Sequence, residues 1–191
     1  MLIQAVQFLL ETLFGLFVLA VLLRFYLQWV RAPFHNPFSR FIAALTDFAV
    51  KPLRRIVPGL FGLDLASLLL AWLVEYVMLL ALLWLGGLFM LKAGPSIFIA
   101  IAFLAVIKLL KISVYILLGA VFVQAILSWT NPHTPLAPVL GRLTDPFLRP
   151  LQRIIPPLAN VDLSPLLLFI ICELLLMVPL AWLESIAMRI A

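Results

Sequence analysis

One stretch of this chain occurs twice: residues 45–58 read LTDFAVKPLRRIVP, and residues 143–156 read LTDPFLRPLQRIIP. Eight of the fourteen aligned positions are identical at an offset of 98 residues. Three further pairs align outside this stretch: Asp64 with Asp162 and Glu75 with Glu173 downstream, and, at an offset of 100, Trp29 with Trp129 upstream. A match that extends this far predicts two copies of one structural unit.

Each copy is flanked by apolar stretches long enough to cross a membrane. Of the 191 residues 66% are hydrophobic and 11% are charged, which lies far from the usage of a soluble globular domain. A spanning helix needs about 20 predominantly apolar residues. Four stretches qualify, at about 2–30, 65–91, 109–129 and 163–188. Because these stretches are continuously apolar, the alternating pattern of membrane β-strands is excluded.

The chain is therefore predicted to be an all-α membrane protein with four transmembrane helices in two parallel repeats. The first repeat covers residues 1–91, a connector covers 92–108, and the second repeat covers 109–191. The connector has no counterpart in the first repeat, and it either extends the third helix or lies on the membrane surface. Since each repeat holds an even number of spans, both copies enter and leave on the same side, unlike the inverted repeats of many transporters.

A basic amphipathic segment separates the two spans of each repeat. Residues 38–57 and 136–155 each combine one apolar face with one cationic face, which is typical of helices that lie in the membrane interface. Pro52 and Pro150 are predicted to break these helices one turn before their ends. The basic residues expected to contact anionic lipid or a partner are Arg40, Lys51, Arg54, Arg55, Arg142, Arg149 and Arg153.

The distribution of positive charge predicts the orientation. Nine of the thirteen Lys and Arg residues fall at or between the paired spans, and cytoplasmic loops carry the Lys/Arg excess. The two basic segments are thus expected on the cytoplasmic side, with both termini on the opposite side. The net charge of +5 sits beside the spans and not on a long soluble tail. Anionic lipid head groups are therefore a simpler partner than nucleic acid.

Two carboxylates inside the spans are the candidates for chemistry. Glu75 and Glu173 each follow an aspartate by eleven residues, or about 16 Å of helix, and so are expected near mid-membrane. A carboxylate at that depth is costly and indicates a functional site. The two either share a proton or a cation between the repeats, or each is neutral or hydrogen-bonded across a helix interface. For the second alternative the partners considered are Tyr26, Tyr76, Tyr115, Gln124 and Ser128.

The remaining polar residues are interpreted as structural. Asp64 and Asp162 are expected to N-cap the helices that follow them. Cys172 is the single cysteine, so an intrachain disulfide is excluded. His35 and His133 align across the repeats, but without nearby cysteine or clustered carboxylates they indicate a loop position, and no metal site or cofactor is predicted. No nucleotide-binding or nucleophile motif is present, so no enzymatic activity is predicted.

The pattern Thr-Asp-Pro-x-x-x-Pro-x-x-Arg-x-x-Pro followed by Asp-Leu-Ser-Pro resembles the YggT family of small bacterial and plastid membrane proteins. The second copy is complete, whereas the first departs at Phe48 and at Ala66-Ser67. The resemblance covers nearly the whole chain. It implies an inner-membrane protein without established enzymatic activity. Members of the family have been connected with osmotic tolerance, with cell or plastid division and nucleoid distribution, and in plastids with haem attachment to a cytochrome.

These features favour a non-enzymatic membrane protein that organises other membrane components or assists their assembly. The expected partners are the phospholipid bilayer and either another membrane protein or a further copy of the chain. One alternative is a channel or transporter in which Glu75 and Glu173 line a cation path. Another is a homo-oligomeric scaffold, because four helices enclose little core.

Overall fold

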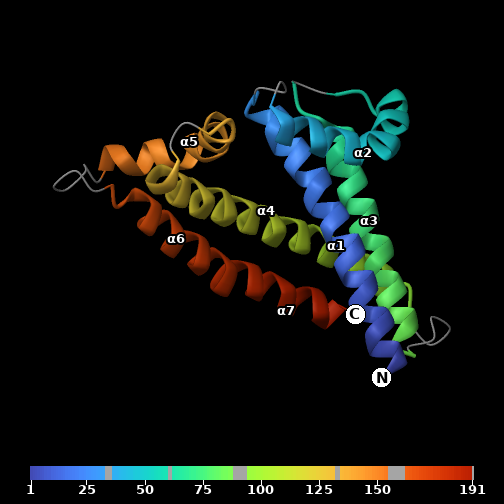
Figure 1. Ribbon diagram of the computed structural model, residues 1–191. Coiled ribbons are helices and arrows are strands. Elements are labelled where there is room, and N and C mark those ends of the chain that lie inside the picture. Colours follow the sequence, from blue (N-terminus) through green and yellow to red (C-terminus); the bar gives the residue numbers. More distant parts are fainter. Residues whose placement is uncertain (33–35, 60–61, 88–93, 132–133, 155–161, 191) are drawn as a thin grey trace.

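The computed structural model describes residues 1–32, 36–59, 62–87, 94–131, 134–154 and 162–190, and the regular structure in these ranges is helical (Figure 1). Four helical runs are long and apolar enough to cross a membrane. They are α1 (Leu2–Trp29), α3 (Leu65–Leu85), α4 (Ser96–Thr130), and a continuous run of α6 (Ser164–Leu175), the π-helical turn η2 (Leu176–Leu180) and α7 (Ala181–Ile190). The predicted all-α membrane architecture is confirmed.

One amphipathic helix joins the two spans of each repeat. It is α2 (Pro37–Ile56) in the first repeat and α5 (Ala137–Ile154) in the second. The N-terminus of α2 is fixed by Asn36, whose side chain accepts the N–H of Phe38 at 2.8 Å, and by a proline at the first helical position. Both helices lie at the same end of the molecule, and both chain termini lie toward the other end (Figure 1). Their bounds differ by one residue at each end from the predicted 38–57 and 136–155.

The prolines of the amphipathic helices do not break them. Pro52 lies inside α2, which continues to Ile56, and Pro150 lies inside α5, which continues to Ile154. The prediction of a break is therefore wrong. A proline removes one backbone donor and frees the carbonyl of the preceding turn. Both prolines are on exposed faces, where water or lipid head groups can bond the freed carbonyl, so the helix tolerates them.

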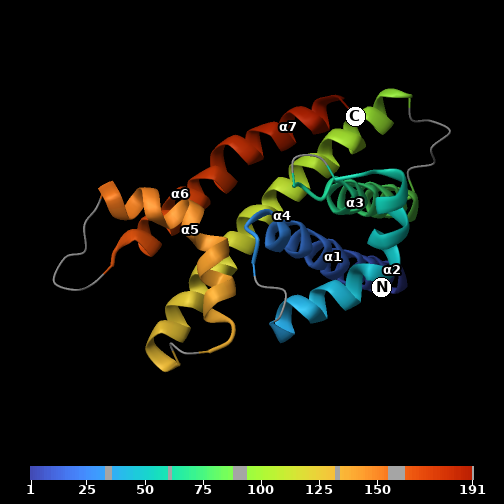
Figure 2. The same ribbon diagram turned by 90° about the horizontal axis from the view of Figure 1, so that it is seen from above.

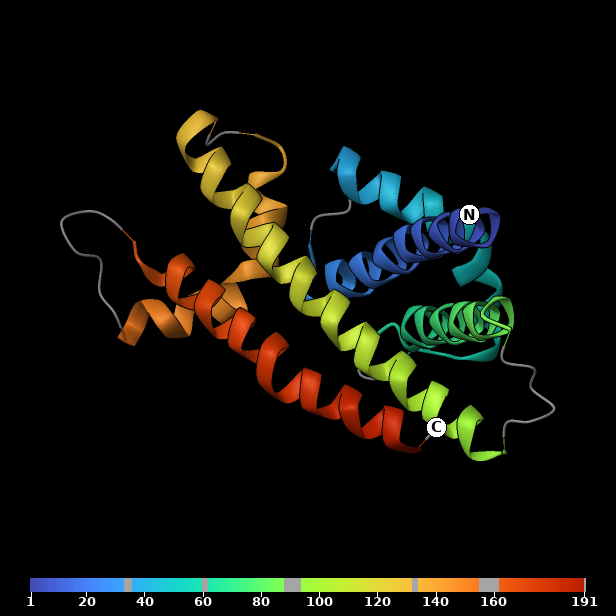
Figure 3. The same cartoon turned by 90° about the horizontal axis from the view of Figure 1, so that it is seen from below.

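The third span, α4, is a single helix of 35 residues and forms the centre of the molecule. It starts at Ser96, so the part of the predicted connector from this residue onward extends the helix. Helices α1 and α3 contact α4 on one side, and α6, η2 and α7 contact it on the other (Figures 2 and 3). At about 1.5 Å per residue α4 is about 52 Å long, which exceeds the hydrocarbon thickness of about 30 Å. It must therefore tilt or project beyond the bilayer core.

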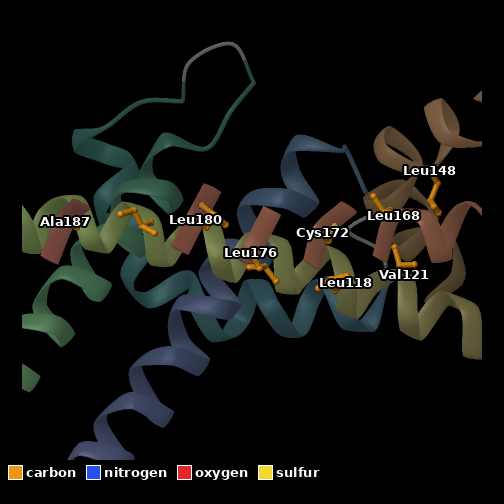
Figure 4. Close-up of a cluster of buried hydrophobic side chains, with 9 residues drawn as sticks. Leu118, Val121, Leu148, Leu168, Cys172, Leu176, Leu180 and Ala187 are labelled. Atoms are coloured by element: carbon orange, nitrogen blue, oxygen red, sulfur yellow. The ribbon is translucent and has the colours of Figure 1, made fainter. Parts of the chain in front are cut away.

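A regular apolar stripe holds the last span against α4. Its members recur every four residues on α6 and η2 and pack with side chains of α4 (Figure 4). They are Leu168, Cys172, Leu176 and Leu180, packed with Ile107, Leu118 and Val121 of α4. The stripe runs through η2, where Pro179 lies within the π-helical turn. A proline is a common cause of such a local change in helical hydrogen bonding.

Candidate functional site

Polar side chains of the first repeat gather where α1, α2 and α3 meet. Arg24 of α1 is only 6% exposed, and its Nη1 donates to Thr46 Oγ1 and to Asp47 Oδ1, both at 2.8 Å. The Nε of the same arginine lies 4.0 Å from Oδ2 of Asp64. Asp47 also accepts from Lys51 at 2.7 Å. One buried cation thus ties α1 to α2 and to the start of α3, and we call this group of residues, together with Arg54 and Ser67, the first junction.

Asp64 lies at the N-cap of α3, where its carboxylate accepts the backbone N–H of Ser67 at 3.4 Å. Arg54 donates to both of its oxygens, at 3.1 and 2.5 Å. Burial favours a higher pKa for Asp64, but the hydrogen bonds from Arg54 and Ser67 and the charge of Arg54 outweigh it and hold the pKa below its ordinary value. The pKa of Arg54 is raised by the same hydrogen bond. Arg54, expected to contact lipid or a partner, is therefore a member of the first junction.

The pKa of Asp47 in the first junction is also lowered. The hydrogen bond from Lys51 has the largest effect, partial burial opposes it, and the hydrogen bond and charge of Arg24 add to it. The ionised form of both junction aspartates is therefore stabilised by the fold. No sequence pattern indicates this role of Arg24, because a single arginine near the end of a predicted span is also typical of a side chain that reaches the interface.

In the second repeat, neutral side chains take the two arginine positions of the first junction. Gln124 occupies the position of the first arginine, and its Oε1 accepts from the hydroxyl of Thr144 at 2.5 Å. Gln152 occupies the position of the second arginine, and its amide donates to Asp162 at 2.8 Å. The two junctions thus share the contact to the threonine and the contact to the second aspartate, but differ in the charge of the side chains that make them. We call the residues around Gln124 and Gln152 the second junction.

Asp162 does not hold the N-cap position that the sequence predicts. The N-cap residue of α6 is Leu163, one position later. The carboxylate of Asp162 nevertheless accepts the backbone N–H of Ser164 at 2.9 Å. Burial favours a higher pKa for Asp162, whereas the hydrogen bonds from Ser164 and Gln152 lower it below its ordinary value. The aspartate therefore satisfies one of the free donors at the start of the helix from just outside it.

Glu75 is fully buried on α3 and faces α4. Its Oε1 lies 3.6 Å from Nζ of Lys108 and has no hydrogen-bond partner in the described part of the chain. The expected hydrogen bond to a tyrosine, glutamine or serine of another helix is therefore wrong for Glu75. The sequence missed Lys108 because this residue was assigned to the connector, whereas the early start of α4 places it within the bundle.

The structure does not bring Glu75 and Glu173 together. Glu173 is exposed on α6, and α6 contacts α4 from the side opposite α3 (Figure 2). The two carboxylates accordingly do not share a proton or a cation in this arrangement. A cation path lined by both residues has no support from their positions.

A second ion pair lies on the other side of α4. Lys111 contacts the carboxylate of Glu184 on α7, and each side chain is about one-quarter exposed. The two lysines are three residues apart on α4, and each pairs with the last span of a different repeat. Helix α4 therefore directs one lysine toward α3 and one toward α7. The two ion pairs favour one rotation of α4 about its own axis.

Apart from Arg54, the predicted basic residues are exposed on α2 and α5, including Lys51 at the edge of the first junction. These are Arg40, Lys51, Arg55, Arg142, Arg149 and Arg153. Two form ion pairs within their own helix, Lys51 with Asp47 and Arg149 with Asp145, the latter at 2.6 Å. On α2 a stripe formed by Phe41, Leu45, Phe48 and Ile56 is also exposed. Because this stripe is not covered by protein, it is available to lipid.

The histidines considered in the sequence, His35 and His133, lie outside the described residues. Within the described ranges no group of three or more His, Cys, Asp or Glu side chains is placed to hold a metal ion. Cys172 is buried in the contact between α6 and α4.

Comparison with known proteins gives one family. The CCB3/YggT family model matches residues 3–85 and 103–183, one match for each repeat. A Vibrio alginolyticus protein named "uncharacterized protein in proC 3'region" is 37% identical over 168 residues, covering 87% of this chain and 89% of that protein. The YggT protein of Escherichia coli K12 is 33% identical over 169 residues, covering 88% and 85%. A Pseudomonas aeruginosa protein is 38% identical over 174 residues, covering 90% and 86%. No solved structure matches the chain.

Proposed function

The chain belongs to the CCB3/YggT family, and from this premise we propose that it is a non-enzymatic multi-pass protein of the bacterial inner membrane that organises other membrane components or assists their assembly. The observation that carries the proposal is the pair of basic helices, α2 and α5, at one end of the molecule (Figure 1). Their cationic side chains are exposed and belong to helices anchored on the spans, so they form a surface that a partner can bind.

The exposed stripe on α2 supports an interfacial position for this surface. Phe48 is 73% exposed and Ile56 is 79% exposed, which is unfavourable in water but favourable at the boundary of the acyl chains. A helix placed in this way directs its basic face toward the head groups and the cytoplasm. The proposed partner is therefore a membrane protein with an acidic surface at the cytoplasmic side of the bilayer, held by electrostatic complementarity.

Affinity capture from gently solubilised membranes tests this proposal. The variant Arg40→Gln/Arg55→Gln/Arg153→Gln removes three exposed charges and leaves both junctions intact. We expect proteins that copurify with the wild-type chain to be lost with this variant. The matched control, with lysine at the same three positions, keeps the charge and is expected to retain them. If the same proteins copurify with all three forms, the basic surface is not the docking surface.

A further inference from the structure

An apolar groove runs along the outside of α4. The C-terminal end of α1 and parts of α5 and α6 form its other walls. Its volume is about 390 Å³, and its walls include Trp29 of α1, Leu110 and Ala120 of α4, and Leu175 of α6. The lining is apolar almost throughout. The hydroxyl of Ser113, which also lines the groove, is bonded to the carbonyl of Leu109 at 2.6 Å. The groove therefore suits a hydrocarbon and offers little to a polar ligand.

The groove has about the length of one leaflet of a bilayer. Along α4 it extends over eleven residues, from Leu110 to Ala120, or about 15 Å at the helical rise. This is half of the hydrocarbon thickness of about 30 Å. The end near Ala120 lies beside α5, with which this residue shares a core cluster. The groove thus starts at the level of the amphipathic helices and ends near the middle of the membrane.

A polar cleft continues the groove at the level of α5. Trp29 and Val30 line both, and the cleft is completed by Arg142, Asp145 and Arg149, with a volume of about 630 Å³. Both arginines are exposed, and only Arg149 bonds to the aspartate, so the cleft carries one net positive charge. Guanidinium groups bind phosphate oxygens with good geometry. A tryptophan at the boundary between the two parts is typical of the membrane interface.

We propose that the groove and the cleft together bind one anionic glycerophospholipid. Its phosphate lies between Arg142 and Arg149, and one acyl chain follows α4 and α6 toward the middle of the membrane. The apolar lining of the groove and the arginines of the adjoining cleft together favour a lipid over a helix of a second protein, because the lipid brings a phosphate to the two arginines. This lipid site goes beyond the proposed function, which concerns other basic residues.

Native mass spectrometry of the purified full chain in detergent tests the site. The probes are palmitoyl-oleoyl phosphatidylglycerol and the corresponding phosphatidylcholine, titrated in parallel. We expect one molecule of the anionic lipid to bind in preference to the zwitterionic one. The variant Arg142→Gln/Arg149→Gln should bind it about thirty-fold more weakly, since each cation near a head group contributes about 1 kcal/mol. The control Lys92→Gln/Arg189→Gln removes the same number of charges outside the basic helices and should bind as the wild type does.

A second pair of variants tests the apolar part. Leu174 and Leu175 are both exposed on α6, but only Leu175 lines the groove. Leu175→Trp should fill the groove and reduce binding of the anionic lipid, whereas Leu174→Trp should not. This comparison, with the two lipids on the wild-type chain, stays decisive if the arginine variant does not fold.

Three results would overturn the lipid site: equal binding of both lipids, unchanged binding by Arg142→Gln/Arg149→Gln, or unchanged binding by Leu175→Trp. A change of oligomeric state in Leu175→Trp without a change in bound lipid would assign the groove to a second copy of the chain. None of these results bears on the docking surface, which is tested with Arg40, Arg55 and Arg153.

Discussion

At the scale of single residues, the contact between Glu75 and Lys108 matters most for stability, because it places a charged carboxylate inside the bundle. The carboxylate is 1% exposed and lies 3.6 Å from the ammonium group. Lys108 is about one-third exposed and compensates the buried carboxylate, so removal of the lysine leaves Glu75 charged in an apolar surrounding. The pair of Lys111 and Glu184 differs in its carboxylate, because the side chain of Glu184 is about one-quarter exposed. The two pairs therefore allow a direct comparison on the same helix.

Lys108→Met should destabilise the protein by about 3 kcal/mol, because Glu75 then has no countercharge. Lys111→Met should cost about 1 kcal/mol, since Glu184 is only partly buried and lies near the end of the last span. The double variant Glu75→Gln/Lys108→Met should recover most of the loss. Thermal unfolding of the purified chain in detergent, followed by size-exclusion fluorescence, measures these differences. Equal losses for the two lysine variants would show that the burial of Glu75 does not determine the energy of its ion pair.

The position of Glu75 within a predicted span marks it as a candidate functional residue, but the sequence does not identify Lys108 as its partner. The cost of a charge in the membrane depends on what surrounds it, and that is set by the start and the rotation of α4. The same holds for Arg24, whose partners Thr46 and Asp47 come from a helix at another angle. The N-cap role of Asp64 was predictable, because an aspartate just before an apolar run is a local signal that needs no tertiary information.

At the scale of elements, the junctions show how one backbone arrangement serves a charged and a neutral set of side chains. In the first repeat Arg24 and Arg54 neutralise Asp47 and Asp64, whereas in the second repeat two glutamines take the arginine positions. Among the described residues, Asp145 is then paired with Arg149 of its own helix alone. The first junction should therefore respond to pH more strongly than the second.

The comparison of Asp64→Asn with Asp162→Asn tests this difference. Because the pKa of Asp64 is lower in the folded protein than its ordinary value, its ionised form stabilises the fold above about pH 4 and loses this effect as the pH falls through the folded pKa. The melting temperature of Asp64→Asn should lie below that of the wild type at neutral pH by an amount that corresponds to about 2 kcal/mol.

Below about pH 4 the difference in melting temperature should narrow, because the wild-type carboxylate becomes protonated and is then neutral like the asparagine. Asp162→Asn should show a smaller gap at neutral pH, since Asp162 bonds to neutral groups and is exposed. Melting curves between pH 3 and pH 7 provide the measurement. A gap for Asp64→Asn that stays constant over this range would mean that its charge does not stabilise the first junction.

The elements themselves were largely predictable, because hydrophobic length and periodicity are local properties. The amphipathic helices α2 and α5 were placed within one residue at each end. The third span was predicted to begin at about residue 109, and of the two alternatives left open for the connector, the extension of this helix is the one found, because α4 starts at Ser96. The effect of Pro52 and Pro150 was misjudged because their exposure depends on how each helix lies on the bundle.

At the scale of the whole molecule, the arrangement of α2 and α5 at one end and of both termini toward the other determines what the protein presents to each side of a membrane (Figure 1). The excess of Lys and Arg on the two amphipathic helices predicts that their end faces the cytoplasm. The docking surface uses the basic residues of that end, so the side on which its partner is sought follows from this prediction.

Cysteine labelling in intact cells tests the orientation. In a Cys172→Ala background, Ile3→Cys near the start of α1 and Met188→Cys near the end of α7 should react with a membrane-impermeant maleimide. Arg40→Cys on α2 and Arg153→Cys on α5 should react only after the membrane is permeabilised, because the positive-charge rule predicts that they lie on the cytoplasmic side. All four side chains are exposed, so access to the reagent and not burial decides the outcome. Labelling of Arg40→Cys in intact cells, with protection of Ile3→Cys, would reverse the orientation and place the basic helices where the positive-charge rule does not expect them.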